Sequence, residues 1–186
     1  MNCWSGSSGA VWRLSRLPNH SIPAEVPSWS RDGRWIYFSS DRTGEDQVWK
    51  IPAEGGEAVQ VTRRGGPAGF ESPDGKFLYY AKGLQETSIW NVPVGRGEET
   101  QVVESLVNCN NFAVLDSGIY FVPTPPAGTT TYSIQFFDFA TGRTTPISTT
   151  ERPALLGFTV SPDGRWILYT QTDRDATELM LVENFH

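Results

Sequence analysis

The sequence predicts an all-β fold in which one small antiparallel sheet is repeated along the chain. Two recurring motifs with nearly the same period support this, together with a composition rich in turn residues. The 186 residues include 18 Gly and 13 Pro, which favours frequent turns over long helices. An apolar content of 38%, with 12% aromatic residues, is enough for a buried core and excludes a disordered tail.

The first motif is a Ser-x-Asp-Gly corner followed by an alternating apolar run. It occurs at 29–38, 71–80 and 160–169, with a degenerate copy at 114–121. The corner glycines Gly33, Gly75, Gly118 and Gly164 are therefore separated by 42, 43 and 46 residues. The second motif is an apolar stretch that occurs at 48–52 and 89–93. Apolar stretches at the same position of the repeat are found at 136–139 and 179–182. Two motifs with one period indicate a structural repeat.

Each repeat has the local signals of a four-stranded sheet. In the corner, Pro presets φ, Asp bonds the nearby backbone and Gly adopts positive φ. In the first repeat, residues 35–38 alternate as a strand does, 47–51 form a second apolar strand, and 58–62 follow a Gly-rich turn as a short outer strand. With the strand before the corner, the unit has four strands, which is the blade of a β-propeller.

The repeat predicts four blades, at 27–66, 67–108, 109–153 and 154–186. The segment 1–26 is expected to hold one or two strands of a preceding or closing blade, the better of them at 9–17. About four blades plus loose strands suggest a partial or fragmentary ring. Three arrangements stay open: an incomplete arc, a small four-bladed ring, and two chains that pair into a larger ring. Unpaired blade edges favour association, such as a homodimer.

Aromatic residues recur at matching phases of the repeat. Neighbouring blades need large side chains to fill the space between them, so we expect these residues to belong to the core rather than to a ligand-stacking site. They are Trp29, Trp35, Trp49, Trp90 and Trp166.

The corner-and-strand string resembles the TolB-like (WD40-like) propeller repeat. The Gly-His and Trp-Asp marks of WD repeats themselves are absent. The resemblance extends from about residue 10 to residue 186. The C-terminal repeat further resembles the last blade of bacterial multi-domain sensor and regulator proteins, in which a winged-helix or kinase domain precedes the propeller. The resemblance implies a propeller module and carries over neither kinase nor DNA-binding activity.

Motifs for catalysis or cofactor binding are not found. A Gly-x-Ser-x-Gly nucleophile elbow and a phosphate-binding Gly-rich loop do not occur. Two histidines, His20 and His186, and two cysteines, Cys3 and Cys109, form no zinc-binding pattern. We therefore expect no enzyme activity, no cofactor and no metal. The net charge of −6 argues against nucleic-acid contact.

Acidic residues in two places could suggest a metal or catalytic site. The loop with Asp41, Glu45 and Asp46 and the loop with Asp173 and Asp175 fit no calcium-binding spacing, so a solvated surface is favoured. The corner residues Asp32, Asp74 and Asp163 occupy one repeat position, which favours turn formation over a catalytic set.

The sequence favours a non-catalytic interaction or ligand-sensing module, as the C-terminal part of a larger bacterial signalling protein. The alternative is an accessory propeller that gates a hydrolase or lyase domain. One face of a propeller is formed by two kinds of loop: those that join the outer strand to the inner strand of the next blade, and those that join the second strand to the third. Such loops often carry binding residues. In this sequence they lie at 41–42, 63–66, 82–86, 152 and 173–174. From them we predict a binding set: Asp41, Arg42, Arg63, Arg64, Arg152, Asp173 and Arg174.

Neither the ligand nor the compartment follows from the sequence. We expect no signal peptide and no transmembrane segment, because no stretch approaches the required apolar length. The family resemblance allows an extracytoplasmic location within a longer parent protein.

Overall fold

The computed structural model describes residues 26–95, 97–129, 131–152, 154–173 and 176–183. In these ranges the chain forms strands and turns without a helix, so no described helix is long and apolar enough to cross a membrane. The strand predicted at 9–17 lies outside the described residues.

The strands form four antiparallel sheets in chain order. The first sheet contains β1 (Ser28–Trp29), β2 (Trp35–Ser40), β3 (Gln47–Pro52) and β4 (Val59–Gln60). The second contains β5 (Ala68–Glu71), β6 (Phe77–Ala81), β7 (Gln85–Pro93) and β8 (Thr100–Asn108). The third contains β9 (Phe112–Val114), β10 (Gly118–Phe121), β11 (Tyr132–Asp138) and β12 (Thr144–Thr150). The fourth contains β13 (Ala154–Val160), β14 (Trp166–Asp173) and β15 (Ala176–Glu183).

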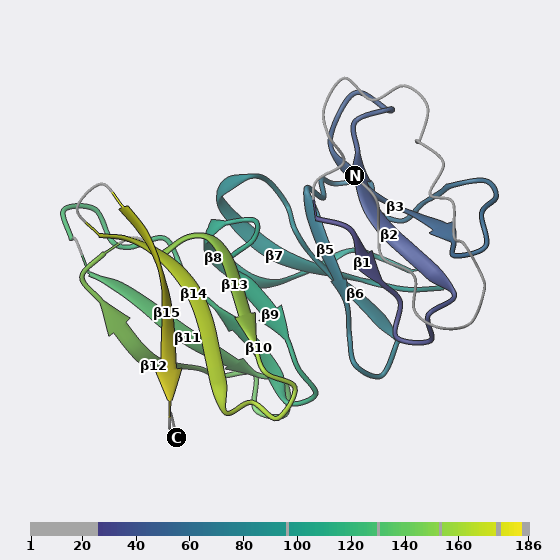
Figure 1. Cartoon of the computed structure of the whole chain (residues 1–186). Coiled ribbons are helices and arrows are strands. Elements are labelled where there is room, and N and C mark those ends of the chain that lie inside the picture. Colours follow the sequence, from purple (N-terminus) through teal and green to yellow (C-terminus); the bar gives the residue numbers. More distant parts are fainter. Residues whose placement is uncertain (1–25, 96, 130, 153, 174–175, 184–186) are drawn as a thin grey trace.

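Each sheet is a propeller blade, and the blades pack in chain order. Contacts between blades run from β1 and β2 to β5, from β5 to β9, and from β9 to β13. Figure 1 shows the first blade on the right of the view and the third and fourth blades on the left, where they overlap. The predicted all-β fold of repeated antiparallel blades is confirmed.

The Ser-x-Asp-Gly corners join the first two strands of three blades. In the first blade, the Ser30 hydroxyl donates to Asp32 (2.7 Å) and accepts from the backbone N–H of Trp35 (2.9 Å). Gly33 has φ of 70°, which side chains disfavour. The serine–aspartate bond recurs at Ser72–Asp74 (2.7 Å) and Ser161–Asp163 (2.6 Å). These contacts confirm that the corner aspartates form turns.

Three hydrophobic clusters fill the spaces between consecutive blades. The first joins Tyr37 and Val48 to Leu78, Tyr80 and Val92. The second includes Tyr79, Ala81 and Ile89 packed with Phe112, Val114, Ile119 and Phe121. The third joins Tyr120, Val122 and Ile134 to Phe158, Val160, Ile167 and Tyr169. One cluster per blade pair means that burial between sheets stabilises the arrangement.

The prediction that the repeated tryptophans fill this core is wrong for Trp29 and is confirmed in part for Trp90, which packs against the first cluster. Trp29 is 62% exposed, and Trp35, Trp49, Trp90 and Trp166 are only partly buried. Tyrosine, phenylalanine and aliphatic side chains occupy the buried positions instead. Several of the tryptophans serve as platforms for cations; Lys50 Nζ, for example, lies 4.7 Å from the ring centre of Trp35.

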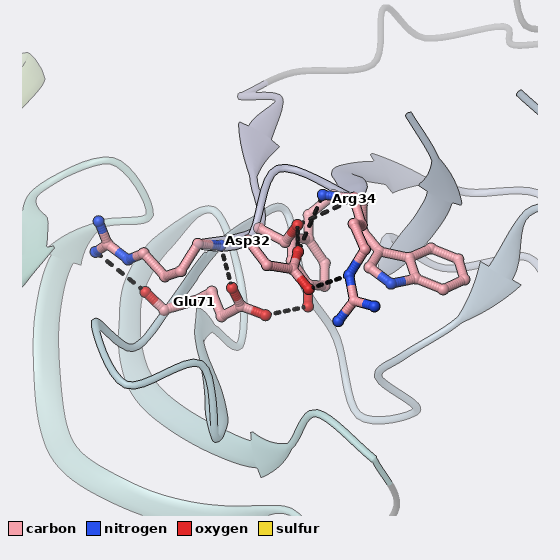
Figure 2. Close-up of polar contacts among 7 residues, drawn as sticks. Asp32, Arg34 and Glu71 are labelled. Carbon is pink, nitrogen blue, oxygen red and sulfur yellow. Dashed lines mark hydrogen bonds and ion pairs between the residues drawn. The ribbon is translucent and has the colours of Figure 1, made fainter. Parts of the chain in front are cut away.

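A buried carboxylate also connects the first two blades. Glu71, at the end of β5, is 6% exposed. It accepts a hydrogen bond from the Tyr37 hydroxyl (2.8 Å) and another from the backbone N–H of Arg31. Figure 2 shows this contact beside the corner that contains Asp32 and Arg34. Burial and the Glu71 carboxylate raise the pKa of Tyr37, which keeps its hydroxyl protonated as a donor.

Candidate functional site

A cleft of about 510 Å³ opens between the first and second blades. Three loops line it: the β2–β3 loop, the β4–β5 loop and the β6–β7 loop. These loops lie at the end of the blades opposite to the Asp-Gly corners, because they follow β2, β4 and β6 while the corners precede β2 and β6. We call this space the inter-blade cleft. Its lining residues are Asp41, Gly44, Glu45, Asp46, Arg64, Gly65, Pro67, Lys82, Gly83 and Leu84.

The cleft loops are held by hydrogen bonds from the blades themselves. The side-chain amide oxygen (Oε1) of Gln47 accepts from the N–H of Gly65 (3.2 Å) and from the hydroxyl of Thr62 (3.1 Å). Gly65 has φ of +108°, and a Cβ there would lie 2.1 Å from the backbone oxygen of Lys82. Only glycine lets the β4–β5 and β6–β7 loops approach this closely. The same contacts that join the first two blades therefore also hold the loops that line the cleft.

The basic wall of the cleft consists of Arg64 and Lys82, which share one aromatic platform. Lys82 Nζ lies 4.7 Å from the ring centre of Trp90, and Arg64 Cζ lies 5.7 Å from it. Arg64 Nε also lies 3.7 Å from the Glu99 carboxylate, whose side chain is 8% exposed. Both cations are themselves exposed. The platform thus holds two exposed cations at the cleft, of which Arg64 is also paired with Glu99.

The acidic wall is the β2–β3 loop, with Asp41, Glu45 and Asp46. The loop turns through a hydrogen bond from the N–H of Gly44 to the carbonyl oxygen of Asp41 (2.7 Å). Glu45 is exposed, while Asp41 and Asp46 are half-buried. Carboxylates on this wall and cations on the other make the cleft dipolar, with three negative and two positive side chains.

Two buried polar groups lie behind the basic wall. Burial and the nearby Glu99 carboxylate raise the pKa of the Tyr80 hydroxyl. That hydroxyl has no hydrogen bond of good geometry among the described residues. Glu99 Oε1 accepts from the backbone N–H of Arg63 (2.6 Å). Glu99 thus anchors the β4–β5 loop to the second blade and sets the position of Arg64.

The structure brings two members of the predicted binding set into the cleft, Asp41 and Arg64. Arg42, next to Asp41, instead lies over Trp49, with Cζ 4.3 Å from the ring centre, and its Nε donates to the Ser40 hydroxyl (3.0 Å). The Arg63 side chain is exposed and does not line the cleft. Its contribution is the backbone bond to Glu99.

Two other predicted residues, Arg152 and Asp173, lie in the third and fourth repeats and do not line the cleft. The half-buried Arg152 lies between β12 and β13, and its backbone bonds the Thr150 hydroxyl. Asp173 ends β14, and Arg174 lies outside the described residues. Of the described members of the predicted set, Asp41 and Arg64 therefore line the cleft, whereas Arg42, Arg63, Arg152 and Asp173 do not.

Sequence reasoning missed several residues that shape the cleft. Lys82 belongs to the loop 82–86, which was expected on the binding face of the propeller, but it was not in the predicted binding set. Glu45 and Asp46 were considered only as calcium ligands, and Trp90 only as core. A charged residue just after β6, in phase with Asp41 after β2, was the available signal for Lys82. Among the described residues no group of three or more acidic, histidine or cysteine side chains is placed to hold a metal ion.

Comparison with known proteins supports the fold. No family model matches the chain. An uncharacterized protein of Agrobacterium fabrum is 47% identical over 48 residues, which cover 26% of this chain and 16% of that protein. TolB from Acinetobacter baumannii superposes with a TM-score of 0.70 at 19% identity, over 84% of this chain and 40% of TolB.

Two further solved structures have the same architecture. Oligogalacturonate lyase from Vibrio parahaemolyticus matches with a TM-score of 0.60 at 17% identity, over 82% of this chain and 50% of the lyase. Hydrazine synthase from Kuenenia stuttgartiensis matches with a TM-score of 0.64 at 20% identity, over 86% of this chain and 51% of that chain. The chain thus spans about half or less of the length of these proteins. At such identities the likeness concerns the fold, and the chain has the fold of a TolB-like β-propeller.

Proposed function

We propose that the chain is a non-catalytic binding module whose ligand site is the inter-blade cleft. The observation that carries the proposal is the dipolar lining: an acidic β2–β3 loop faces Arg64 and Lys82 across about 510 Å³. Loops on a rigid scaffold are where propellers and other β folds place their binding residues. The hydrogen bonds of Gln47 and the close approach at Gly65 preorganise these loops, which lowers the entropic cost of binding.

The ligand best suited to such a lining is a peptide segment with neighbouring acidic and basic side chains. Its carboxylate would meet Arg64 and Lys82, and its cation would meet Glu45 and the two aspartates. Leu84, 54% exposed at the rim, offers an apolar contact beside the charges. Charge complementarity of this kind supplies orientation and specificity more than raw affinity. The module would therefore recognise a protein partner, as expected for part of a signalling protein.

The second candidate is an accessory propeller beside a hydrolase or lyase. Its support is the likeness to oligogalacturonate lyase and to puromycin hydrolase, which matches with a TM-score of 0.52 at 19% identity. The neighbouring reading frames distinguish the two: a winged-helix or kinase frame upstream favours the binding module, and an α/β-hydrolase frame downstream favours the accessory role.

Titration calorimetry with two peptides of equal length tests the proposal. One alternates Glu and Lys, and the other replaces both with Ser. We expect binding of the charged peptide, weakened at least tenfold by Lys82→Glu and by Glu45→Lys. The matched controls are Arg143→Glu and Glu57→Lys, which make the same charge changes at exposed positions away from the cleft. Equal loss in the controls, or no loss at Lys82 and Glu45, would exclude the cleft as the site.

A further inference from the structure

Glu99 is a nearly buried carboxylate behind the basic wall of the inter-blade cleft, and its two oxygens have different surroundings. Its side chain is 8% exposed. Oε1 accepts a hydrogen bond from the backbone N–H of Arg63 (2.6 Å), whereas Oε2 is buried and makes no hydrogen bond of good geometry among the described residues. A buried carboxylate oxygen without a donor is costly, because water no longer solvates its charge. A cation close to Oε2 is therefore needed to balance it.

The cation next to Oε2 is Arg64. Its Nε lies 3.7 Å from Oε2, which is within ion-pair range but too long for a hydrogen bond. The fully buried Tyr80 hydroxyl lies in the field of both groups, since the Glu99 carboxylate raises its pKa and Arg64 lowers it. Part of the attraction that the Arg64 guanidinium can exert on an anion is thus already spent on Glu99.

Lys82, the other cation of the basic wall, has no such competitor. Its Nζ lies 4.7 Å from the ring centre of Trp90, the platform that it shares with Arg64. Among the described residues no carboxylate lies within ion-pair distance of Lys82. A ligand anion therefore meets one cation at full strength and one that Glu99 has partly neutralised. The basic wall is weaker than two exposed cations alone would make it.

The acidic wall is the stronger of the two. Its three carboxylates line the cleft, and with Glu99 four carboxylates stand against two cations. The arginines that belong to the same loops, Arg42 and Arg63, do not line the cleft. A cleft with an excess of negative side chains attracts cationic groups and repels anionic ones.

We propose that Glu99 sets the charge preference of the inter-blade cleft, which selects peptide segments in which basic side chains outnumber acidic ones. Glu99 does not line the cleft, so it is a positioning residue that acts through Arg64. The acidic side chain of the ligand fixes its orientation at the basic wall, and the additional basic side chains supply the attraction to the acidic wall. This inference rests on the proposed function and defines its ligand class more narrowly.

Titration calorimetry with two peptides of equal length tests the charge preference. One peptide repeats the unit Lys-Glu-Lys and the other repeats Glu-Lys-Glu, so that they differ in the sign of their net charge. We expect the wild type to bind the basic peptide at least about tenfold more tightly at low ionic strength. Equal affinities, or a preference for the acidic peptide, would overturn the inference. If neither peptide binds, the proposed function itself is wrong.

Glu99→Gln tests whether Glu99 sets this preference. The amide keeps an oxygen for the N–H of Arg63 and removes the charge beside Arg64. We expect the ratio of the two affinities to fall at least about threefold, because the acidic peptide binds more tightly. A purely structural role would weaken both peptides alike and leave the ratio unchanged, which would overturn the inference.

The matched control is Glu104→Gln, which makes the same charge change at an exposed position of β8 outside the cleft. It should change the affinity ratio less than about twofold. An equal change in Glu99→Gln and Glu104→Gln would show that only the net charge of the protein matters, and the inference would fail. Circular dichroism checks that both variants are folded.

The Arg64→Gln background tests whether Glu99 acts through its neighbour. Without the guanidinium, Glu99→Gln should change the affinity ratio less than about twofold. An undiminished effect in this background would mean that Glu99 repels the ligand directly, and the positioning role would be wrong.

Discussion

Replacing Tyr37 with phenylalanine removes one hydroxyl from the contact between the first two blades. That hydroxyl belongs to a side chain 1% exposed and donates to Glu71, which is 6% exposed, over 2.8 Å (Figure 2). A buried hydrogen bond to a charged acceptor contributes about 1.5–3 kcal/mol, and its loss leaves a carboxylate oxygen without that donor. We expect Tyr37→Phe to lower the free energy of unfolding by about 2 kcal/mol. For a chain of this size that corresponds to a fall in Tm of about 4–8 °C.

Urea unfolding followed by tryptophan fluorescence measures this change, and Tyr80→Phe is the control. Tyr80 is fully buried at the same contact, but its hydroxyl makes no hydrogen bond of good geometry among the described residues. Its removal should change stability by less than about 0.5 kcal/mol. A double-mutant cycle with Glu71→Gln should give a coupling energy of about 1 kcal/mol or more. If both tyrosine variants lose the same stability, the Glu71 carboxylate does not hold the blades together as we reason.

Two further predictions concern glycine and the corner aspartates. Gly65→Ala places a Cβ against the backbone oxygen of Lys82, so we expect it to lower the free energy of unfolding in urea by at least about 2 kcal/mol. The control Gly128→Ala, where φ is +81° but no atom lies near the added Cβ, should lower it by about 1 kcal/mol. Equal losses in the two variants would show that the Cβ at residue 65 does not clash. The Ser72 hydroxyl and the Lys76 N–H lower the pKa of Asp74 from 3.8 to about 2, so its stabilising effect is complete above about pH 4 and disappears as the pH falls toward 2. The stability difference between wild type and Asp74→Asn should therefore shrink across that window, and a difference that stays constant from pH 7 to pH 2 would refute the assignment.

The corners could be predicted because their hydrogen bonds are local. Ser30, Asp32 and Trp35 lie within six residues and bond one another, so the sequence motif contains the whole interaction. The spacing of such corners then predicts the blades. The exposure of Trp29 could not be predicted in this way, because burial depends on a neighbouring sheet rather than on the repeat position.

The cleft was predictable only in part for the same reason. Asp41 and Arg64 follow strands whose position in the blade the repeat reveals, so the face on which they lie could be predicted. Arg64 and Lys82 share Trp90, while Arg42 lies over Trp49. These contacts depend on how the side chains pack in the folded blades, and in the case of Arg64 on a partner 26 residues away in the sequence. Glu71 illustrates the limit further, since in the sequence it stands where Trp29 and Val160 stand and gives no sign of the bonds it accepts.

Glu71 makes the second blade different from the other blades, and this limits how the repeats can be exchanged. A transplanted copy of the fourth blade would keep its own hairpins, because the corner bonds are internal to each unit. It would arrive with Val160 at the position of Glu71 and could not accept the bonds from Tyr37 and Arg31. Shuffled or consensus versions of this protein should therefore keep the first two repeats together as a pair.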